Sequence, residues 1–126
     1  MISSIKILWQ WIKVLGWYLL KSYNIDEVRE IIKSKQKKND IIITPHAKDR
    51  CHKRKIRKNY VLDSIINKVP LGNIKTEPNS FRLIYSHETD NTMDLHIIIN
   101  VTDNRTVKVI TLYPRARSWR EHETRK

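Results

Sequence analysis

The sequence predicts an α+β fold, with helices packed on a largely antiparallel sheet of four to five strands and an extra N-terminal helical segment. The second half of the chain holds several short runs rich in Ile and Val, a composition typical of strands. Asp-Asn pairs at 90–91 and 103–104 lie in the short connections between the last three runs. Such turn residues in short connections favour an antiparallel meander.

Length and composition limit the class of protein. At 126 residues with 40% hydrophobic content, we expect one compact domain at 41–117, an N-terminal helical extension at 1–40 and a basic tail at 118–126. Two glycines argue against a Gly-rich phosphate loop. The single cysteine, Cys51, excludes an intramolecular disulfide and favours a reducing, cytoplasmic setting.

The N-terminal segment is predicted to be an amphipathic helix. Apolar residues recur at helical spacing between positions 5 and 20, while Lys6, Gln10 and Lys13 fall off that stripe. A membrane-spanning helix needs about 20 nearly uninterrupted apolar residues. We expect the stripe to pack on its own domain or on a second copy in a homodimer. Membrane contact through its tryptophans is the less favoured alternative.

The next elements follow in order along the first half. Asn24 and Glu27 have the spacing of a capping box, so a helix should begin there. A short strand at 41–44 leads into a basic helix at about 46–54. A further helix at 59–68 should turn three apolar side chains inward and end at Pro70; these are Val61, Ile65 and Val69.

The remaining elements are strands. They are expected at 73–77, 81–86, 95–101 and 106–113. In the second of these, Phe81, Leu83 and Tyr85 should share one face. The last strand is apolar on both faces and should therefore be an interior strand of the sheet.

The basic helix predicts a polyanionic partner. The thirteen residues at 46–58 hold seven Lys or Arg against one acid, so they contribute +6 of the formal net charge of +12. The partner that such a cationic helix favours is nucleic acid. At helical spacing, Ala47 and Cys51 form a packing side, and Ile56 closes the core beyond the helix. The opposite side presents the charges, namely His46, Arg50, Lys53, Arg54 and Arg57.

A histidine beside clustered arginines can serve RNA cleavage, which needs a base for the ribose 2′-hydroxyl, cations for the transition state and an acid for the leaving oxygen. The candidate catalytic residues are His46, Arg50, Arg54 and Tyr113. The candidate nucleic-acid-binding residues are Lys48, Lys53, Arg57, Lys58, Arg115 and Arg117.

Each of these residues also has a structural interpretation. A histidine at a helix start often caps or packs, and a run of cations often positions phosphates without reacting. Tyr113 could be a core residue with its hydroxyl at the rim, and His96 a strand residue with satisfied hydrogen bonds. We expect no cofactor and no metal, because one thiol and scattered histidines lack zinc-site spacing.

The segment from Thr44 to Ile56, TPHAKDRCHKRKI, resembles the HAxxRxxxRxI opening of the small proteins grouped as domain-of-unknown-function 4258. The closing run VITLYP at 109–114 fits as well, and the resemblance covers about 41–117. One departure is Lys55, where the family commonly has glycine. By motif position, His46, Arg50 and Arg54 carry over as site residues.

That family is similar to the RelE and BrnT toxins of toxin–antitoxin systems. The resemblance implies a RelE-like small RNase fold and an mRNA endoribonuclease, acting free or on the ribosome and held inactive by an antitoxin. Two alternatives stay open. One is a non-catalytic nucleic-acid-binding protein, and the other is a membrane-surface or partner-binding accessory protein that uses the aromatic N-terminus.

Overall fold

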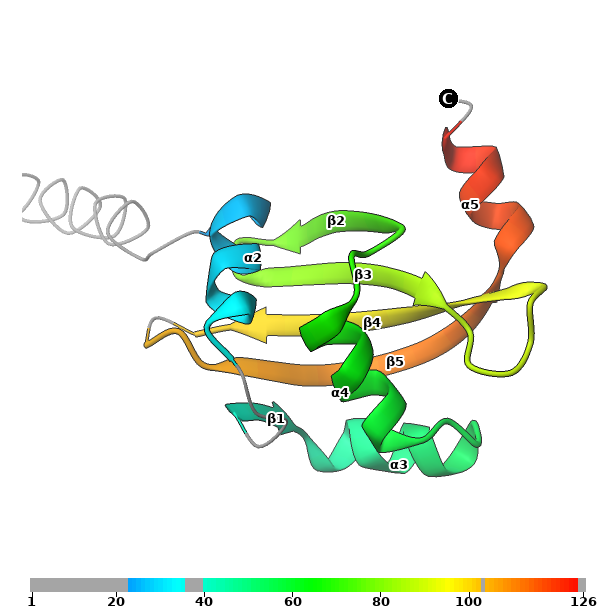
Figure 1. The fold of residues 1–126 in the computed structure, drawn as a ribbon, viewed down its shortest axis with the longest axis horizontal. Coiled ribbons are helices and arrows are strands. Elements are labelled where there is room, and N and C mark those ends of the chain that lie inside the picture. Colours follow the sequence, from blue (N-terminus) through cyan, green and yellow to red (C-terminus); the bar gives the residue numbers. More distant parts are fainter. Residues whose placement is uncertain (1–22, 36–39, 103, 125–126) are drawn as a thin grey trace, which may run out of the picture.

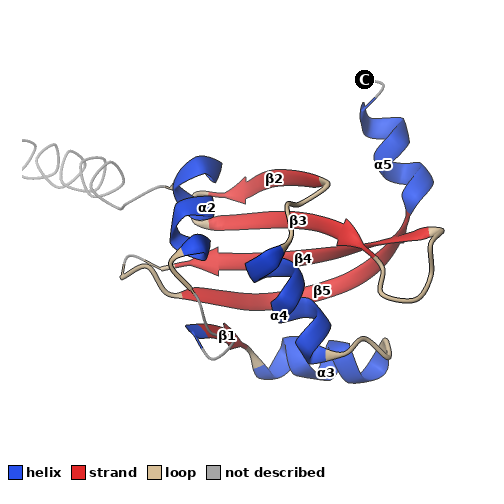
Figure 2. Cartoon of the chain, in the orientation of Figure 1, coloured by secondary structure: helices blue, strands red, loops and turns tan. Residues whose placement is uncertain are grey.

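The computed structural model describes residues 23–35, 40–102 and 104–124, and side chains as far as Arg120. Within these ranges the chain forms four helices and five strands (Figures 1 and 2), which confirms the α+β class. The amphipathic helix predicted between positions 5 and 20, with its possible homodimer contact, lies outside the described residues.

The five strands form one sheet in the order β1-β5-β4-β3-β2. Only the β1–β5 pair is parallel, so the sheet is largely antiparallel as predicted. β5 is an interior strand, also as predicted, with β1 on one side and β4 on the other. The strands are β1 (Ile41–Ile43), β2 (Gly72–Glu77), β3 (Ser80–Ser86), β4 (Met93–Val101) and β5 (Val107–Ala116).

Helices cover one face of this sheet. α2 (Ile25–Lys33) and α4 (Lys58–Asn67) cross that face, while α3 (Pro45–Lys53) lies along the edge next to β1 and β5 (Figure 1). α5 (Arg117–Thr124) follows directly after β5. The core lies between the sheet and the helices. Its strand residues are Ile41, Ile43, Phe81, Leu83, Tyr85, Leu95, Ile97, Ile99, Val101, Val107, Val109 and Leu112.

Local sequence signals explain the helix bounds, with one exception. The Asn24 side chain accepts the N–H of Glu27 at 2.9 Å, and the Glu27 carboxylate accepts the N–H of Asn24 at 3.3 Å, which confirms the capping box. Val61 and Ile65 are buried in α4 as predicted. The inward placement of Val69 is wrong: α4 ends at Asn67, the backbone of Lys68 is extended, and Val69 is 75% exposed.

A β-bulge in β5 reverses the direction of its side chains. Ile98 of β4 pairs with Thr111, but Ile99 pairs with Val109, so Ile110 is an extra residue without a partner on β4. Because strand side chains alternate between faces, one extra residue exchanges the two faces for everything that follows. Leu112 therefore enters the core, and Tyr113, only partly buried, lies on the opposite face.

The turn after α3 uses a residue in the left-handed conformation. Lys55 has φ 54°, which glycine adopts at no steric cost. The N–H of Ile56 donates to the carbonyl of Cys51 at 2.9 Å, and the N–H of Lys55 to that of His52 at 3.3 Å. These two bonds are those of a Schellman motif, and the motif brings Ile56 back into the core, where it is buried.

Replacing Lys55 by glycine should stabilise the protein. Glycine relieves the strain of the left-handed backbone but loses more conformational entropy on folding, so we expect a net gain of about 0.5–1 kcal/mol in the free energy of unfolding. Denaturant titration measures this change. The control Lys53→Gly, two residues earlier and in the last turn of α3, should instead destabilise. Equal effects of the two variants would contradict the assignment.

Candidate nucleic-acid interface

Thr44 fixes the start of α3 against the bulge of β5. Its N–H donates to the carbonyl oxygen of Val109 at 3.1 Å. Its hydroxyl lies 2.9 Å from that oxygen and 3.1 Å from the carbonyl oxygen of Ile110, and it accepts the N–H of Ala47 at 3.2 Å. Thr44 is therefore the N-cap of α3, and the capping interpretation of His46 is wrong.

The two predicted sides of α3 are confirmed. Ala47 and Cys51 are buried, and burial raises the pKa of the Cys51 thiol, against the weaker opposing effect of the Lys58 charge. This thiol is therefore protonated and contributes an apolar contact. On the other side, His46 and Arg54 are exposed and Arg50 is half-buried.

The structure brings the four candidate catalytic residues to one place. Arg50 and Arg54 border a hollow of about 260 Å³ together with Thr111, Leu112 and Tyr113 of β5. His46 does not border it but is linked to it, because Nε of Arg50 donates to Nε2 of His46 in a long hydrogen bond of 3.5 Å. That bond requires an unprotonated Nε2.

Tyr113 also belongs to a second group of side chains, on the sheet face turned away from α2 and α4. Its ring stacks on that of His96, with centroids 5.2 Å apart, and the Trp119 ring meets His96 edge-on at 5.4 Å. Two guanidinium carbons lie over Trp119, that of Arg115 at 3.7 Å and that of Arg82 at 5.0 Å. We call this set, with Asp94, Arg117 and Arg120, the His96 cluster.

His96 is fully buried, and neither of its ring nitrogens has a hydrogen-bond partner among the residues that the structure describes. Burial lowers the pKa of His96 to about 4, with help from the charges of Arg82 and Arg115 and against the opposing charge of Asp94. The ring is therefore neutral at pH 7. The expectation that His96 has satisfied hydrogen bonds is wrong.

Asp94 ties α5 to the sheet. This buried carboxylate lies 2.7 Å from Nε of Arg120 and 3.9 Å from Nε of Arg117. Among the described side chains, the cluster therefore sets four arginines against one carboxylate. Tyr113 belongs both to this cluster and to the lining of the hollow beside α3, so the two groups of cationic side chains adjoin each other.

The candidate binding residues fall into three groups. Lys48 and Lys58 are exposed. Lys53 pairs with Asp49 at 3.1 Å, and Arg57 pairs with Glu88. Arg57 does not continue the charged side of α3 as predicted: the helix ends at Lys53 and the chain reverses, so Arg57 lies at the N-cap of α4.

The remaining two candidates, Arg115 and Arg117, belong to the His96 cluster. Sequence reasoning missed the rest of it, namely Arg82, Asp94, Trp119 and Arg120. The sequence does contain a signal for Arg82: it alternates with the core residues Phe81 and Leu83, and this alternation indicates that its side chain lies on the outer face. For Trp119 the sequence offers no comparable signal, since its position depends on the turn from β5 into α5.

A scan against models of known protein families finds no match to this chain, and searches of curated proteins and of solved structures find none either. In the described ranges, no helix is long and apolar enough to cross a membrane. In the same ranges, no group of three or more His, Cys, Asp or Glu side chains is placed to hold a metal ion.

Thr44→Val should destabilise the protein by about 1–3 kcal/mol, because it removes the N-cap of α3 and the hydroxyl contact with the bulge while keeping the side-chain volume. Urea titration measures the loss. Thr44→Ser keeps the hydroxyl and should cost clearly less. Equal stability of the valine and serine variants would show that the hydroxyl does not fix α3.

His96 should make stability depend on pH. Between about pH 6.5 and pH 4 the unfolded chain takes up a proton on His96 that the folded chain excludes. Stability is therefore lost as the pH falls through this window, by about 3 kcal/mol in total, and is unaffected by His96 above it. Urea titrations from pH 8 to pH 4 should show the wild type losing this increment relative to His96→Leu. Parallel curves would contradict a neutral, buried His96.

Proposed function

We propose that this chain is an endoribonuclease that binds RNA along the hollow beside α3 and the His96 cluster. The observation that carries the proposal is the convergence of Arg50, Arg54 and Tyr113 on one hollow, with His46 hydrogen-bonded to Arg50. An imidazole whose Nε2 accepts only a long hydrogen bond, two cations and a phenol are the groups that cleavage of RNA by its own 2′-hydroxyl requires.

In the proposed reaction, Nε2 of His46 accepts the proton of the ribose 2′-hydroxyl. The 2′-oxygen forms a bond to the adjacent phosphorus, and the bond from phosphorus to the 5′-oxygen breaks. Tyr113 gives its hydroxyl proton to that leaving oxygen, so the products are a 2′,3′-cyclic phosphate and a 5′-hydroxyl. Arg50 and Arg54 balance the charge that builds up on the phosphoryl oxygens.

The His96 cluster would hold the RNA next to the cleaved bond. Bases of single-stranded RNA stack on aromatic and guanidinium planes, and Trp119 with Arg115 offers such planes. Arg82 offers a further charge for a phosphate. His96, neutral and buried, supports the Tyr113 ring from below rather than accepting a proton.

We also propose that the chain is a RelE-like toxin that acts in the cytoplasm on mRNA, free or on the ribosome, and is held inactive by an antitoxin. Support comes from the Thr44–Ile56 motif and from an α+β fold whose helices leave one sheet face to the cationic cluster. A net charge of +12 favours an acidic antitoxin.

A second candidate function is nucleic-acid binding without cleavage. The stacking of Arg115 on Trp119 and the four arginines of the His96 cluster favour it, because they supply stacking and phosphate contacts without a second acid or base. The two candidates differ in whether His46 is needed for chemistry or only adds to the cationic surface.

RNA cleavage by the purified chain tests the proposal. On end-labelled single-stranded RNA under single-turnover conditions, we expect His46→Ala and Arg50→Ala each to slow cleavage by about 100-fold or more, with RNA affinity changed far less. Tyr113→Phe should slow it as well. The control Arg105→Asn removes an arginine from the β4–β5 turn, at the other end of β5, and should leave the rate unchanged.

Modified RNA substrates and binding measurements can contradict the proposed mechanism. RNA with a 2′-deoxy sugar at the cleaved position should resist, and its cleavage would exclude the proposed mechanism. RNA bound with a steep salt dependence but never cut would favour the second candidate. If the chain neither binds nor cuts RNA, both candidates fail.

A further inference from the structure

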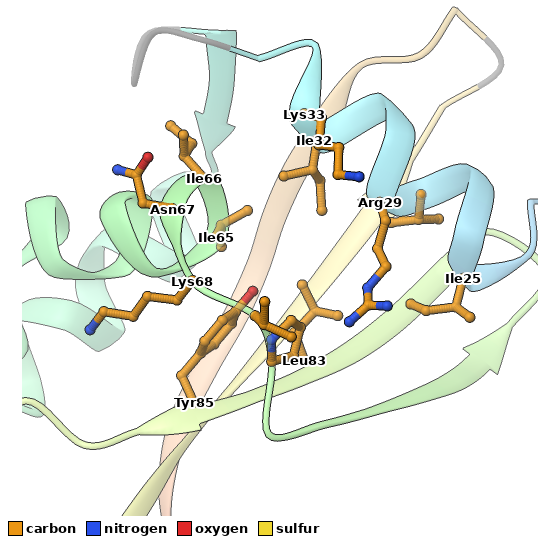
Figure 3. Close-up of a pocket in the computed structure, with 13 residues that line it drawn as sticks. Ile25, Arg29, Ile32, Lys33, Ile65, Ile66, Asn67, Lys68, Leu83 and Tyr85 are labelled. Atoms are coloured by element: carbon orange, nitrogen blue, oxygen red, sulfur yellow. The ribbon is translucent and has the colours of Figure 1, made fainter.

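A pocket of about 430 Å³ opens between α2, α4 and β3, on the helix-covered side of the sheet (Figure 3). This volume is within the range of small-molecule sites, about 300–1,000 Å³. Its walls are mostly aliphatic, formed by Ile25, Val28, Ile32, Ile65, Ile66 and Leu83. The pocket faces away from the His96 cluster, because Leu83 and Tyr85 alternate with Arg82 along β3.

Two hydrogen-bond donors reach this apolar space. Tyr85 is 2% exposed, and its hydroxyl makes no hydrogen bond to any described residue. Burial raises the pKa of that hydroxyl, with the Arg29 charge opposing the rise, so the phenol keeps its proton and can donate it. Figure 3 shows Arg29 extending from α2 toward Tyr85, whereas Lys68 points away from the pocket.

The described part of the chain does not supply a carboxylate for these donors. No carboxylate among the described residues pairs with Arg29, and a guanidinium group matches a carboxylate through two parallel hydrogen bonds. An occupant that satisfies both Arg29 and Tyr85 while filling the aliphatic walls needs an apolar body and a single anionic head.

The positive charge of this protein argues against one of its own segments, or a second copy, as the ligand of the pocket. The segment 1–22 contains Lys6, Lys13 and Lys21 and no acidic residue, and a second copy brings a net charge of +12. Lys33 and Lys68 also line the pocket, although Lys33 pairs with Glu30 at 3.4 Å and the Lys68 ammonium lies over the Tyr60 ring. A small anionic amphipath has the complementary charge.

We infer that this pocket binds a medium-chain aliphatic carboxylate. The alkyl chain lies between α2 and α4, and the carboxylate accepts hydrogen bonds from the Arg29 guanidinium and the Tyr85 hydroxyl. This site is separate from the proposed RNA surface and does not depend on it.

Calorimetric titration of the full chain with sodium decanoate, below its micelle concentration, tests the inference. We expect saturable binding of one decanoate per chain. Arg29→Gln and Tyr85→Phe should each weaken it by about tenfold or more, while Arg105→Asn should leave it unchanged. Because Arg29 is exposed, the Arg29→Gln variant should fold even if the Tyr85→Phe variant does not. Thermal unfolding of both variants checks that they are folded.

Ligands that share the decyl chain but differ in the head group distinguish binding through the negative charge from binding through the alkyl chain alone. Decanol and decyltrimethylammonium should bind at least tenfold more weakly than decanoate. Equal binding of the three, the absence of saturable decanoate binding, or unchanged affinity in both variants would overturn the inference. RNA cleavage should be the same in Arg29→Gln as in the wild type, so failure at this pocket is distinguishable from failure of the proposed function.

Discussion

The arrangement of the surface depends on the β-bulge at Ile110 and on the hydrogen bonds that Thr44 makes to it. The bulge turns the carbonyls of Val109 and Ile110 toward Thr44, whose N–H and hydroxyl bind them. The same extra residue exchanges the faces of β5. Without it, Tyr113 would continue the core-facing series of Val107 and Val109, and Leu112 would face outward.

One local irregularity therefore determines two features of the candidate site. By anchoring the N-terminus of α3 it sets Arg50 and Arg54 beside the second half of β5, and by exchanging faces it directs Tyr113 to the same side as His96. The arginines of the hollow are positioned by α3 itself, because no carboxylate among the described residues pairs with Arg50 or Arg54. Their charges are thus available to an anionic ligand.

Sequence patterns predicted what is local and missed what depends on where the chain turns. The Asn24 capping box and the alternation of Phe81, Leu83 and Tyr85 depend on only a few neighbouring residues, and the structure confirms both. Arg57 was misplaced because the reversal after α3 rests on Lys55, which gives no glycine signal. The proximity of Tyr113 to Arg50 could not be predicted either, since alternation along β5 gives the wrong face unless the bulge is known.

Several buried polar atoms on the outer face of the sheet have no hydrogen-bond partner among the described residues. They include Nε of Arg82 and both ring nitrogens of His96, for which the described ranges offer no partner. Burial of such groups costs free energy that the apolar packing of the other face must offset. A phosphate oxygen would satisfy Arg82, and the neutral His96 ring adds no charge repulsion to Arg82 and Arg115 beside it. An anionic ligand bound at this cluster, as proposed above, would offset part of the free-energy cost of these unpaired groups.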